Sequence, residues 1–213
     1  MSKKLILVCC LMLLATVAGC ADPTKDKPEA AVDEPAAEPA RPADAARFIL
    51  AEQSSIGFVG SKVTGSHDGG FESFEGEILV VDGDPTKSSV NITIDTTSIW
   101  ADNEKLTGHL KSADFFDVET YPTATFTSTE IRQEGDGYVM VGNLNLHGIT
   151  KSISFPVDIA VADDRVTASA EFAIKRFDFD IVYPGKPDDL IRDGVLIKLE
   201  VVGTPAGEGG AEA

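Results

Sequence analysis

The sequence predicts an all-β fold, an antiparallel barrel of roughly eight strands with a short helical insertion at one end. Apolar and polar residues alternate in many segments of strand length, and turn-forming residues separate these segments. No segment between them shows a helical period over about 15 residues, so the crossover helices of parallel sheets are not expected. Because each strand has one apolar face, the sheet must close into a barrel or pack as a sandwich.

The strands follow one another with short connections. Alternation is weaker in residues 48–52, 56–63, 74–81 and 124–131, and stronger in 90–94, 144–146, 153–161, 166–174 and 195–201. Turn residues stand between segments at 82–85, 134–137, 147–148 and 163–164. Eight or nine strands of this kind predict a barrel wide enough inside to hold one small ligand.

Residues 102–117 interrupt the alternation and predict the helical insertion. Asp102 is a candidate helix cap, and Leu106 and Leu110 lie four residues apart on one helical face. Pro122 then returns the chain to extended geometry. This connection is far longer than a hairpin needs, so we expect it to lie across one end of the barrel.

Two adjacent aromatic residues, Phe115 and Phe116, stand within this insertion. Asp114 is a candidate cap for the turn that holds them. Three roles are open for the pair: a buried plug, a lid over a cavity, or a patch that binds a partner.

The N-terminus predicts export and lipidation. Lys3 and Lys4 precede an apolar run, residues 5–17, that is too short for an ordinary transmembrane helix, so residues 1–19 are expected to be a signal peptide. The ending Val17-Ala18-Gly19-Cys20 resembles a bacterial lipobox, in which Cys20 would be lipidated. The alternative is an ordinary signal peptide with an incidental cysteine.

Residue Ala21, in place of Asp, favours the outer membrane in the Gram-negative pattern. The expected localisation is therefore extracytoplasmic, as a membrane-anchored lipoprotein of the periplasm.

The rest of the chain divides into a tether, one domain and a tail. Residues 20–46 are dominated by Ala, Pro and charged residues, which predicts a disordered tether reaching roughly 80 Å. Residues 47–203 form the predicted β-barrel domain, and residues 204–213 a second disordered segment. All three cysteines lie in residues 1–20, so the domain offers no cysteine for a disulfide, a thiolate nucleophile or a metal.

Composition and motifs argue against several functions. The net charge of −17 is unfavourable for non-specific nucleic-acid binding. Residues 65–71 are glycine-rich but lack the GK[ST] ending, so we expect a flexible connection between strands, and no phosphate loop. His67, His109 and His147 could form a three-histidine metal site only if the fold brought them together, and their spacing does not indicate this. We therefore predict no metal site.

A family resemblance adds to this interpretation. It rests on stretches that follow one another over residues 48–203: FESFEG (71–76), SI (98–99), HLKSADFFD (109–117), YP (121–122), TF (125–126), GNL (142–144), HG (147–148), TK (150–151), RFDF (176–179) and DGV (193–195). In these stretches the chain resembles the YceI-like family of lipocalin-like periplasmic proteins.

The resemblance implies a lipocalin-like antiparallel barrel whose elongated interior binds a polyisoprenoid chain, attached to a quinone or a pyrophosphate. No catalytic activity is firmly attached to that family, so neither a catalytic residue nor a cofactor is implied beyond a bound isoprenoid lipid or quinone. Seven residues are implied to line the cavity or close its mouth: Phe71, Phe74, Leu110, Phe115, Phe116, Tyr121 and Phe126. The chain departs from the family pattern at Thr107-Gly108, Trp100-Ala101 and Asp180.

Three functional hypotheses follow. The first is a non-enzymatic carrier or sequestering protein for an isoprenoid lipid, held at a membrane through Cys20, with a homodimer left open. The acidic charge favours a neutral head group unless lysines converge; the candidates are Lys62, Lys105, Lys111 and Lys151. The second is a hydrolase or metal-dependent enzyme that uses the histidines at the cavity mouth. The third is an adhesion or scaffold module with a filled barrel.

Overall fold

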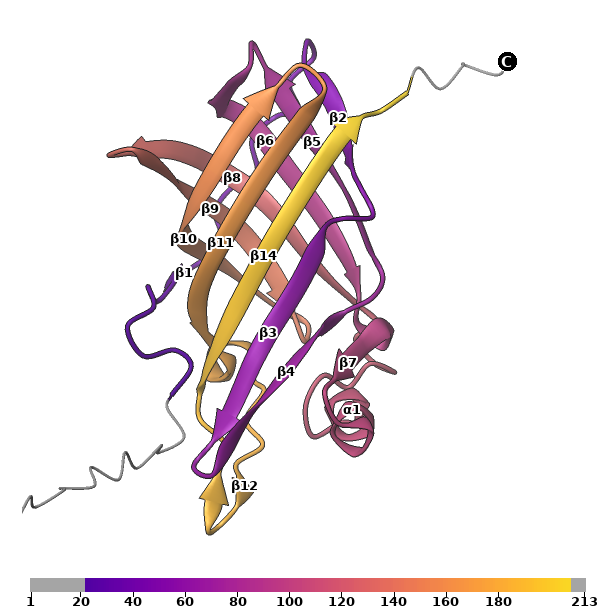
Figure 1. Cartoon of the computed structure of the whole chain (residues 1–213), viewed down its shortest axis with the longest axis vertical. Helices are drawn as coiled ribbons and strands as arrows, with labels where there is room; N and C mark the ends of the chain where they lie inside the picture. Colours follow the sequence, from indigo (N-terminus) through magenta and orange to yellow (C-terminus); the bar gives the residue numbers. More distant parts are fainter. Residues whose placement is uncertain (1–21, 208–213) are drawn as a thin grey trace, which may run out of the picture.

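The computed structural model describes residues 22–207, and the predicted signal peptide, Cys20 and residues 208–213 lie outside this range. Eight antiparallel strands close into a barrel, which confirms the predicted fold class (Figure 1). In order around the barrel they are β2 (Ala46–Leu50), β5 (Phe74–Val81), β6 (Asp84–Asp95), β8 (Thr123–Glu134), β9 (Gly137–Leu146), β10 (Ile149–Ala162), β11 (Arg165–Lys175) and β14 (Gly194–Pro205).

Strand β14 closes the barrel by pairing on both of its edges. One edge pairs with β11 from Gly194 to Gly203. The other pairs first with β3 (Ser55–Lys62) and then, from Gly203 onward, with β2. Strand β2 pairs with β5 and so belongs to the closed barrel. Strand β3 pairs instead with β4 (Gly65–Phe71), and β4 pairs with β7 (Ile99–Ala101), so the sheet extends beyond the barrel on this side.

Strand β4 corrects one prediction. Its residues were expected to form a flexible connection, but they pair with β3 along the whole strand. The glycines are needed for close packing: a Cβ at Gly69 would lie 2.3 Å from Cζ of Phe58 and 2.6 Å from the carbonyl oxygen of Trp100. Low side-chain volume here indicates tight contact between strands and aromatic rings.

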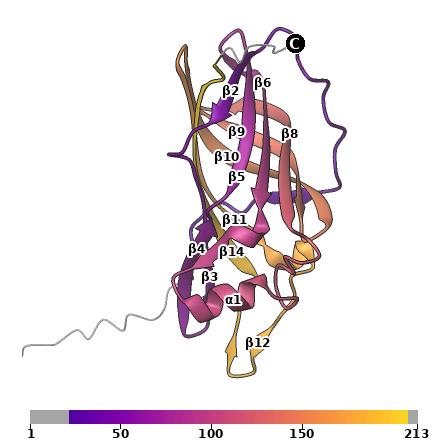
Figure 2. The same ribbon diagram turned by 90° about the vertical axis from the view of Figure 1, so that its right-hand side faces the viewer.

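A single α-helix is found in the described residues, and it is short, as predicted. Helix α1 (Glu104–Lys111) lies across one end of the barrel (Figure 2). Its cap is Asn103, whose side chain accepts the Leu106 N–H at 3.1 Å; the predicted cap, Asp102, instead bonds His67 at 2.8 Å. No helix in the described range is long and apolar enough to cross a membrane.

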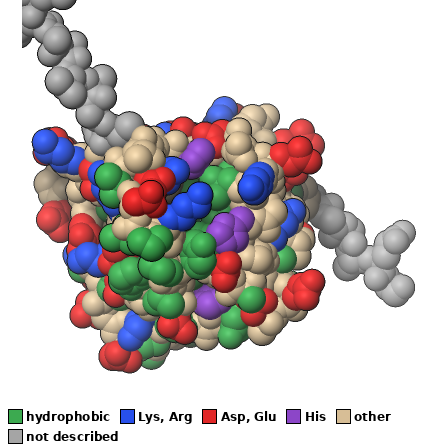
Figure 3. All heavy atoms as spheres, turned by 90° about the horizontal axis from the view of Figure 1, so that it is seen from below, with side chains coloured by type: hydrophobic (Ala, Val, Ile, Leu, Met, Phe, Trp, Pro, Cys, Tyr) green, Lys and Arg blue, Asp and Glu red, His purple; other side chains and the backbone are tan. Residues whose placement is uncertain are grey.

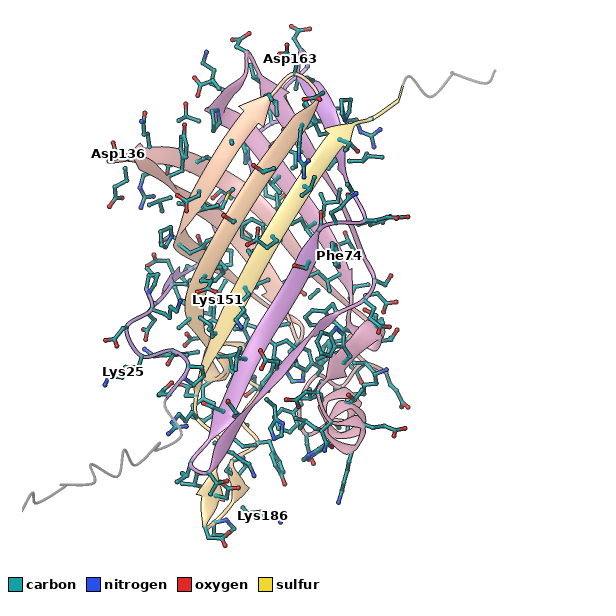
Figure 4. The ribbon with its side chains drawn as sticks, in the orientation of Figure 1. Lys25, Phe74, Asp136, Lys151, Asp163 and Lys186 are labelled. Atoms are coloured by element: carbon teal, nitrogen blue, oxygen red, sulfur yellow. The ribbon has the colours of Figure 1, made fainter. Side chains whose placement is uncertain are left out.

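The two ends of the barrel differ. The end that carries α1 is called the helix end below, and it also holds η1 (Thr96–Ser98), η2 (Arg176–Phe179) and the hairpin of β12 (Gly185–Lys186) and β13 (Asp189–Leu190) (Figure 1). The opposite, far end is formed by tight turns, such as the one that contains Asp163 (Figure 4). Turns between strands are found at residues 82–83, 135–136, 147–148 and 163–164, and the remaining residues of the predicted turns lie at strand ends.

Residues 22–46 overturn the prediction of a disordered tether. Strand β1 (Ala31–Asp33) pairs with β10, Ala30 is only 4% exposed, and Glu29 bridges to Ala173 of β11. Farther along, the Asn143 side chain accepts the Ala36 N–H at 2.9 Å and donates to the Ala36 carbonyl at 2.8 Å. We call residues 22–46 the strap.

The strap is ordered because the barrel leaves a strand edge for it to pair with. Strand β10 pairs with β11 only through residues 158–162, so the rest of its edge lacks a partner there. Strand β1 pairs with residues 152–154 of this edge, and Ala30 joins the core between β10 and β11. Backbone pairing of this kind needs few apolar side chains, so composition did not reveal it.

The C-terminal boundary also shifts slightly. Thr204 and Pro205 belong to β14 and pair with β2, so the barrel extends past the predicted boundary at residue 203.

Amide hydrogen exchange tests the docking of the strap. The amides of Ala30 and Ala36 should exchange far more slowly than those of an unstructured peptide. Replacing Asn143 with Ala removes both hydrogen bonds to Ala36, each worth about 1 kcal/mol, so exchange at Ala36 should accelerate at least about fivefold while Ala30 stays protected.

Asn145→Ala is the matched control, because Asn145 lies on the same strand and bonds Thr150 at 2.7 Å. Unprotected amides at both Ala30 and Ala36 in the unmodified protein would show that the strap is not docked.

Candidate functional site

The barrel is hollow. A cavity of about 380 Å³ runs along its interior, from Pro85 and Ser88 at the far end to Lys62 and Arg192 at the helix end. Its volume lies within the range of small-molecule sites, roughly 300–1,000 Å³. A barrel filled by its own side chains would leave no such space, so the filled barrel of the adhesion or scaffold hypothesis is wrong.

The cavity wall consists of the inward-facing residues of the alternating strands. On β10 and β11 these include Phe155 and Phe172, whose rings stack at 4.0 Å. Small residues leave room at the axis: Ala168 and Ala170 share the inner face of β11, and Ala124 lines the wall from β8. An almost wholly apolar wall suits a ligand with a long hydrocarbon chain.

Five of the seven predicted site residues line this cavity. They are Phe71, Leu110, Phe115, Phe116 and Phe126. Leu110 and Phe115 are buried in one core cluster with Ile99 and Ile181, which joins the helical insertion to the barrel.

Phe115 and Phe116 have different surroundings. Phe115 is 6% exposed, and its ring contacts the rings of His109 and Tyr183 at 4.9 and 5.2 Å. The rings of His109 and Tyr183 also contact each other, at 4.9 Å. Phe116 is half-buried and packs edge-on against Phe71 at 5.9 Å. Because both also line the cavity, the plug and lid roles are combined: Phe115 anchors the insertion, and Phe116 covers the space.

Phe74 and Tyr121 lie outside the lining of the main cavity. Phe74 packs against Ile56 and Ile94 and lines a second, more polar hollow beside β3 and β4 (Figure 4). It lies there because β5 pairs with β2 and has no ladder to β3, so a large side chain fills the space between them.

Tyr121 supports the helix end from outside the cavity. Its ring meets that of His147 at 4.7 Å and packs over Gly148, where a Cβ would lie 2.5 Å from the ring. Gly148 has a positive φ of 75° in the turn between β9 and β10. The contacts of Tyr121 thus indicate a structural role.

The helix end of the cavity is polar, and sequence reasoning missed it. Arg176 lines the cavity at 4% exposure, and its guanidinium donates to three carbonyl oxygens: Arg192 at 3.0 Å, Ile191 at 3.3 Å, and Ile181. Burial lowers the pKa of Arg176 and the Asp193 carboxylate opposes this, so the side chain remains cationic. The sequence pattern does indicate that residue 176 faces the cavity, because it continues the inward register of residues 166, 168, 170, 172 and 174.

Ser61 lies in the wall at the same end. It is 5% exposed, and its Oγ is the one buried side-chain polar atom in residues 22–207 without a hydrogen-bond partner. Its backbone carbonyl accepts the Arg192 N–H at 2.9 Å. A buried hydroxyl without a partner is costly, so this atom marks a place where a polar ligand group would be stabilised.

Of the four lysines considered in the sequence, only Lys62 lines the cavity. The Lys62 ammonium pairs with the Asp189 carboxylate at 2.5 Å. The hydrogen bonds from Lys62 and Thr64 hold the pKa of Asp189 below its usual range. Lys151 instead pairs with Glu34 of the strap at 3.1 Å. The positive charge at the cavity therefore comes from Lys62 and from the arginines that the sequence did not single out.

The three histidines have different partners. His67 bonds Asp102 at 2.8 Å, His109 bonds Asp114 at 2.9 Å, and His147 bonds the Phe179 carbonyl at 3.2 Å. Within residues 22–207 no three His, Cys, Asp or Glu side chains are grouped to hold a metal ion. The three histidines therefore do not form a shared metal site in the described part of the chain.

Comparisons with known proteins agree with this geometry. Residues 49–203 match the YceI-like domain. A UPF0312 protein of Pectobacterium atrosepticum is 39% identical over 119 residues, and protein YceI of Escherichia coli O157:H7 is 38% identical over the same length. Each alignment covers 53% of this chain and 62% of the relative, so the match spans less than two thirds of these curated proteins.

Two solved structures share the fold. BcnA of Burkholderia cenocepacia is 26% identical with a TM-score of 0.61, over 70% of this chain and 96% of that protein. A polyisoprenoid binding domain from Saccharophagus degradans, implicated in plant cell wall breakdown, is 18% identical with a TM-score of 0.62, over 76% of this chain and 99% of that domain. At 18% identity the second likeness shows the fold alone.

Substitutions test whether Phe115 anchors the helical insertion and whether Phe116 covers the cavity. Phe115→Ala should lower the free energy of unfolding by about 3–5 kcal/mol, because it empties a buried site. Phe116→Ala should cost less than half as much, while weakening the binding of an apolar ligand in a fluorescence titration. Equal stability losses with unchanged ligand binding would contradict these roles.

Proposed function

This chain belongs to the YceI-like domain family, and we propose that it is a non-enzymatic protein that binds an isoprenoid lipid in the barrel cavity. The observation that carries the proposal is a continuous apolar cavity with a polar end. Each buried CH₂ group of a ligand contributes about 0.8 kcal/mol, so a long chain binds tightly without a reactive residue. The structural neighbour from Saccharophagus degradans, which is described as a polyisoprenoid binding domain, supports this ligand class.

The polar end would receive the head group. Ser61 offers an unpaired hydroxyl, and Arg176 and Arg192 bring positive charge to the same end. The acidic composition of the chain favours a neutral head group, but these arginines reduce that repulsion locally. We propose a head group that presents oxygen acceptors, as the carbonyls of a quinone and the oxygens of a pyrophosphate both do.

Membrane attachment is the second part of the proposal. The lipobox-like ending at Cys20 supports lipidation and an extracytoplasmic location, with the outer membrane favoured. The protein would then carry or sequester the isoprenoid lipid at a membrane surface.

Extraction of the purified protein tests the ligand class. Organic extracts analysed by mass spectrometry should contain about one isoprenoid lipid per chain, as expected for one elongated site. Ser61→Ala should leave the apolar chain bound but weaken selection between head groups, because it removes the hydroxyl without a partner from the cavity lining. Recovery of no lipid, together with no binding of added isoprenoid quinone or isoprenyl pyrophosphate, would rule out the proposal.

A further inference from the structure

The start of the strap lies at the polar end of the cavity. Asp22, the first described residue, pairs with the guanidinium of Arg192 at 3.4 Å, and Arg192 lines the cavity. Thr24 packs against Gly194 at the beginning of β14, with its Oγ1 3.1 Å from the position of a Cβ. The strap is therefore fixed to the helix end at its first residues.

Only one residue, Ala21, separates Asp22 from Cys20. A fully extended chain spans at most about 3.6 Å per residue, so a lipid on Cys20 would be tethered within about 7 Å of Asp22. Lipid attached to Cys20 would therefore enter the membrane beside the helix end. This step rests on the lipidation proposed above.

The surface of the helix end is unusually apolar. Four of the six large hydrophobic side chains exposed in the described residues are here: Val63, Phe177, Val182 and Leu190, at 49–57% exposure. Figure 3 looks at this end and shows hydrophobic side chains gathered beside Lys and Arg side chains. We call these four residues the apolar rim.

Backbone contacts hold the apolar rim together around the cavity. The Val63 N–H donates to the Leu190 carbonyl at 3.2 Å, which joins the β3–β4 turn to the β12–β13 hairpin. The Arg176 guanidinium bonds the carbonyls of Ile181 and Ile191, next to Val182 and Leu190. The rim is thus a preformed surface at the polar end of the cavity.

From these observations we propose that the apolar rim docks on the lipid bilayer, so that the polar end of the cavity faces the membrane. An exposed apolar patch of this kind is stabilised by insertion at the boundary of head groups and acyl chains. We infer a bilayer as the partner of the apolar rim, because the proposed lipid anchor at Cys20 brings the membrane to the same end of the molecule. An isoprenoid lipid then passes between bilayer and cavity without crossing water.

Site-specific fluorescence tests the orientation. The full-length protein is produced with its signal, its lipidation is checked by intact mass, and it is reconstituted in phosphatidylcholine vesicles. Because Cys9, Cys10 and Cys20 are the only cysteines, a new cysteine in the mature chain can be labelled alone. An environment-sensitive fluorophore is placed at Val182→Cys in the rim or at Asp163→Cys at the far end.

The fluorophore at position 182 should be blue-shifted, and spin-labelled lipids should quench it at least about fivefold more than the one at 163. Equal and weak quenching at both positions would overturn docking, and stronger quenching at 163 would reverse the orientation. A blue shift at 182 without vesicles, growing with protein concentration, would assign the rim to a second copy of the chain. Absence of acyl mass would reject the lipidation alone.

A pair of variants tests the rim itself. Val63→Ser with Leu190→Ser should reduce the quenching at position 182 about threefold or more, because apolar area is removed. Ile49→Ser is the matched control, since Ile49 is 42% exposed on β2, toward the far end. An equal loss in the control, or no loss in the rim variant, would contradict docking through the rim.

Discussion

Closure of the sheet by backbone hydrogen bonds is the constraint on which the rest of the structure depends. A β-strand edge buried without partners is costly, and β14 removes this cost by pairing with β11 on one side and with β2 and β3 on the other. The split that remains between β10 and β11 is filled by the strap through β1. A barrel closed in this way keeps its shape without side chains meeting at the axis.

The hollow interior follows from this closure and from the sizes of the inward residues. Ala124, Ala168 and Ala170 leave space that large residues would occupy, whereas Phe155 and Phe172 stack to stiffen the wall. At the helix end, Arg176 holds η2 and the β12–β13 region through backbone carbonyls. The same residue thus fixes the fold there and gives the apolar cavity one polar end.

Alternation and turn residues were sufficient to predict the barrel, because period-two burial is a local property of each strand. The glycine-rich strand β4 was not predicted in this way, because Gly69 and Gly70 leave the space that the rings of Phe58 and Trp100 occupy. The strap was also missed, because residues 31–33 are ordered mainly by edge pairing, to which Val32 adds one apolar contact with the core. At the site, Phe74 and Tyr121 share the aromatic character of the lining residues, and only the register of distant strands places them outside the cavity. Arg176 continues the inward register of β11, but its polarity hid it from an argument based on apolar faces, and Ser61 has the opposite register to Ile56 and Phe58 on β3.

The central claim is that the axial cavity holds the ligand chain, and filling that cavity tests it most directly. Ala170→Phe adds a ring to the inner face of β11, whereas Thr167→Phe adds the same ring to the opposite face of the same strand. Lipid bound per chain, measured by mass spectrometry on folded protein, should fall strongly for Ala170→Phe and stay unchanged for Thr167→Phe. Undiminished lipid in a folded Ala170→Phe protein would contradict the claim.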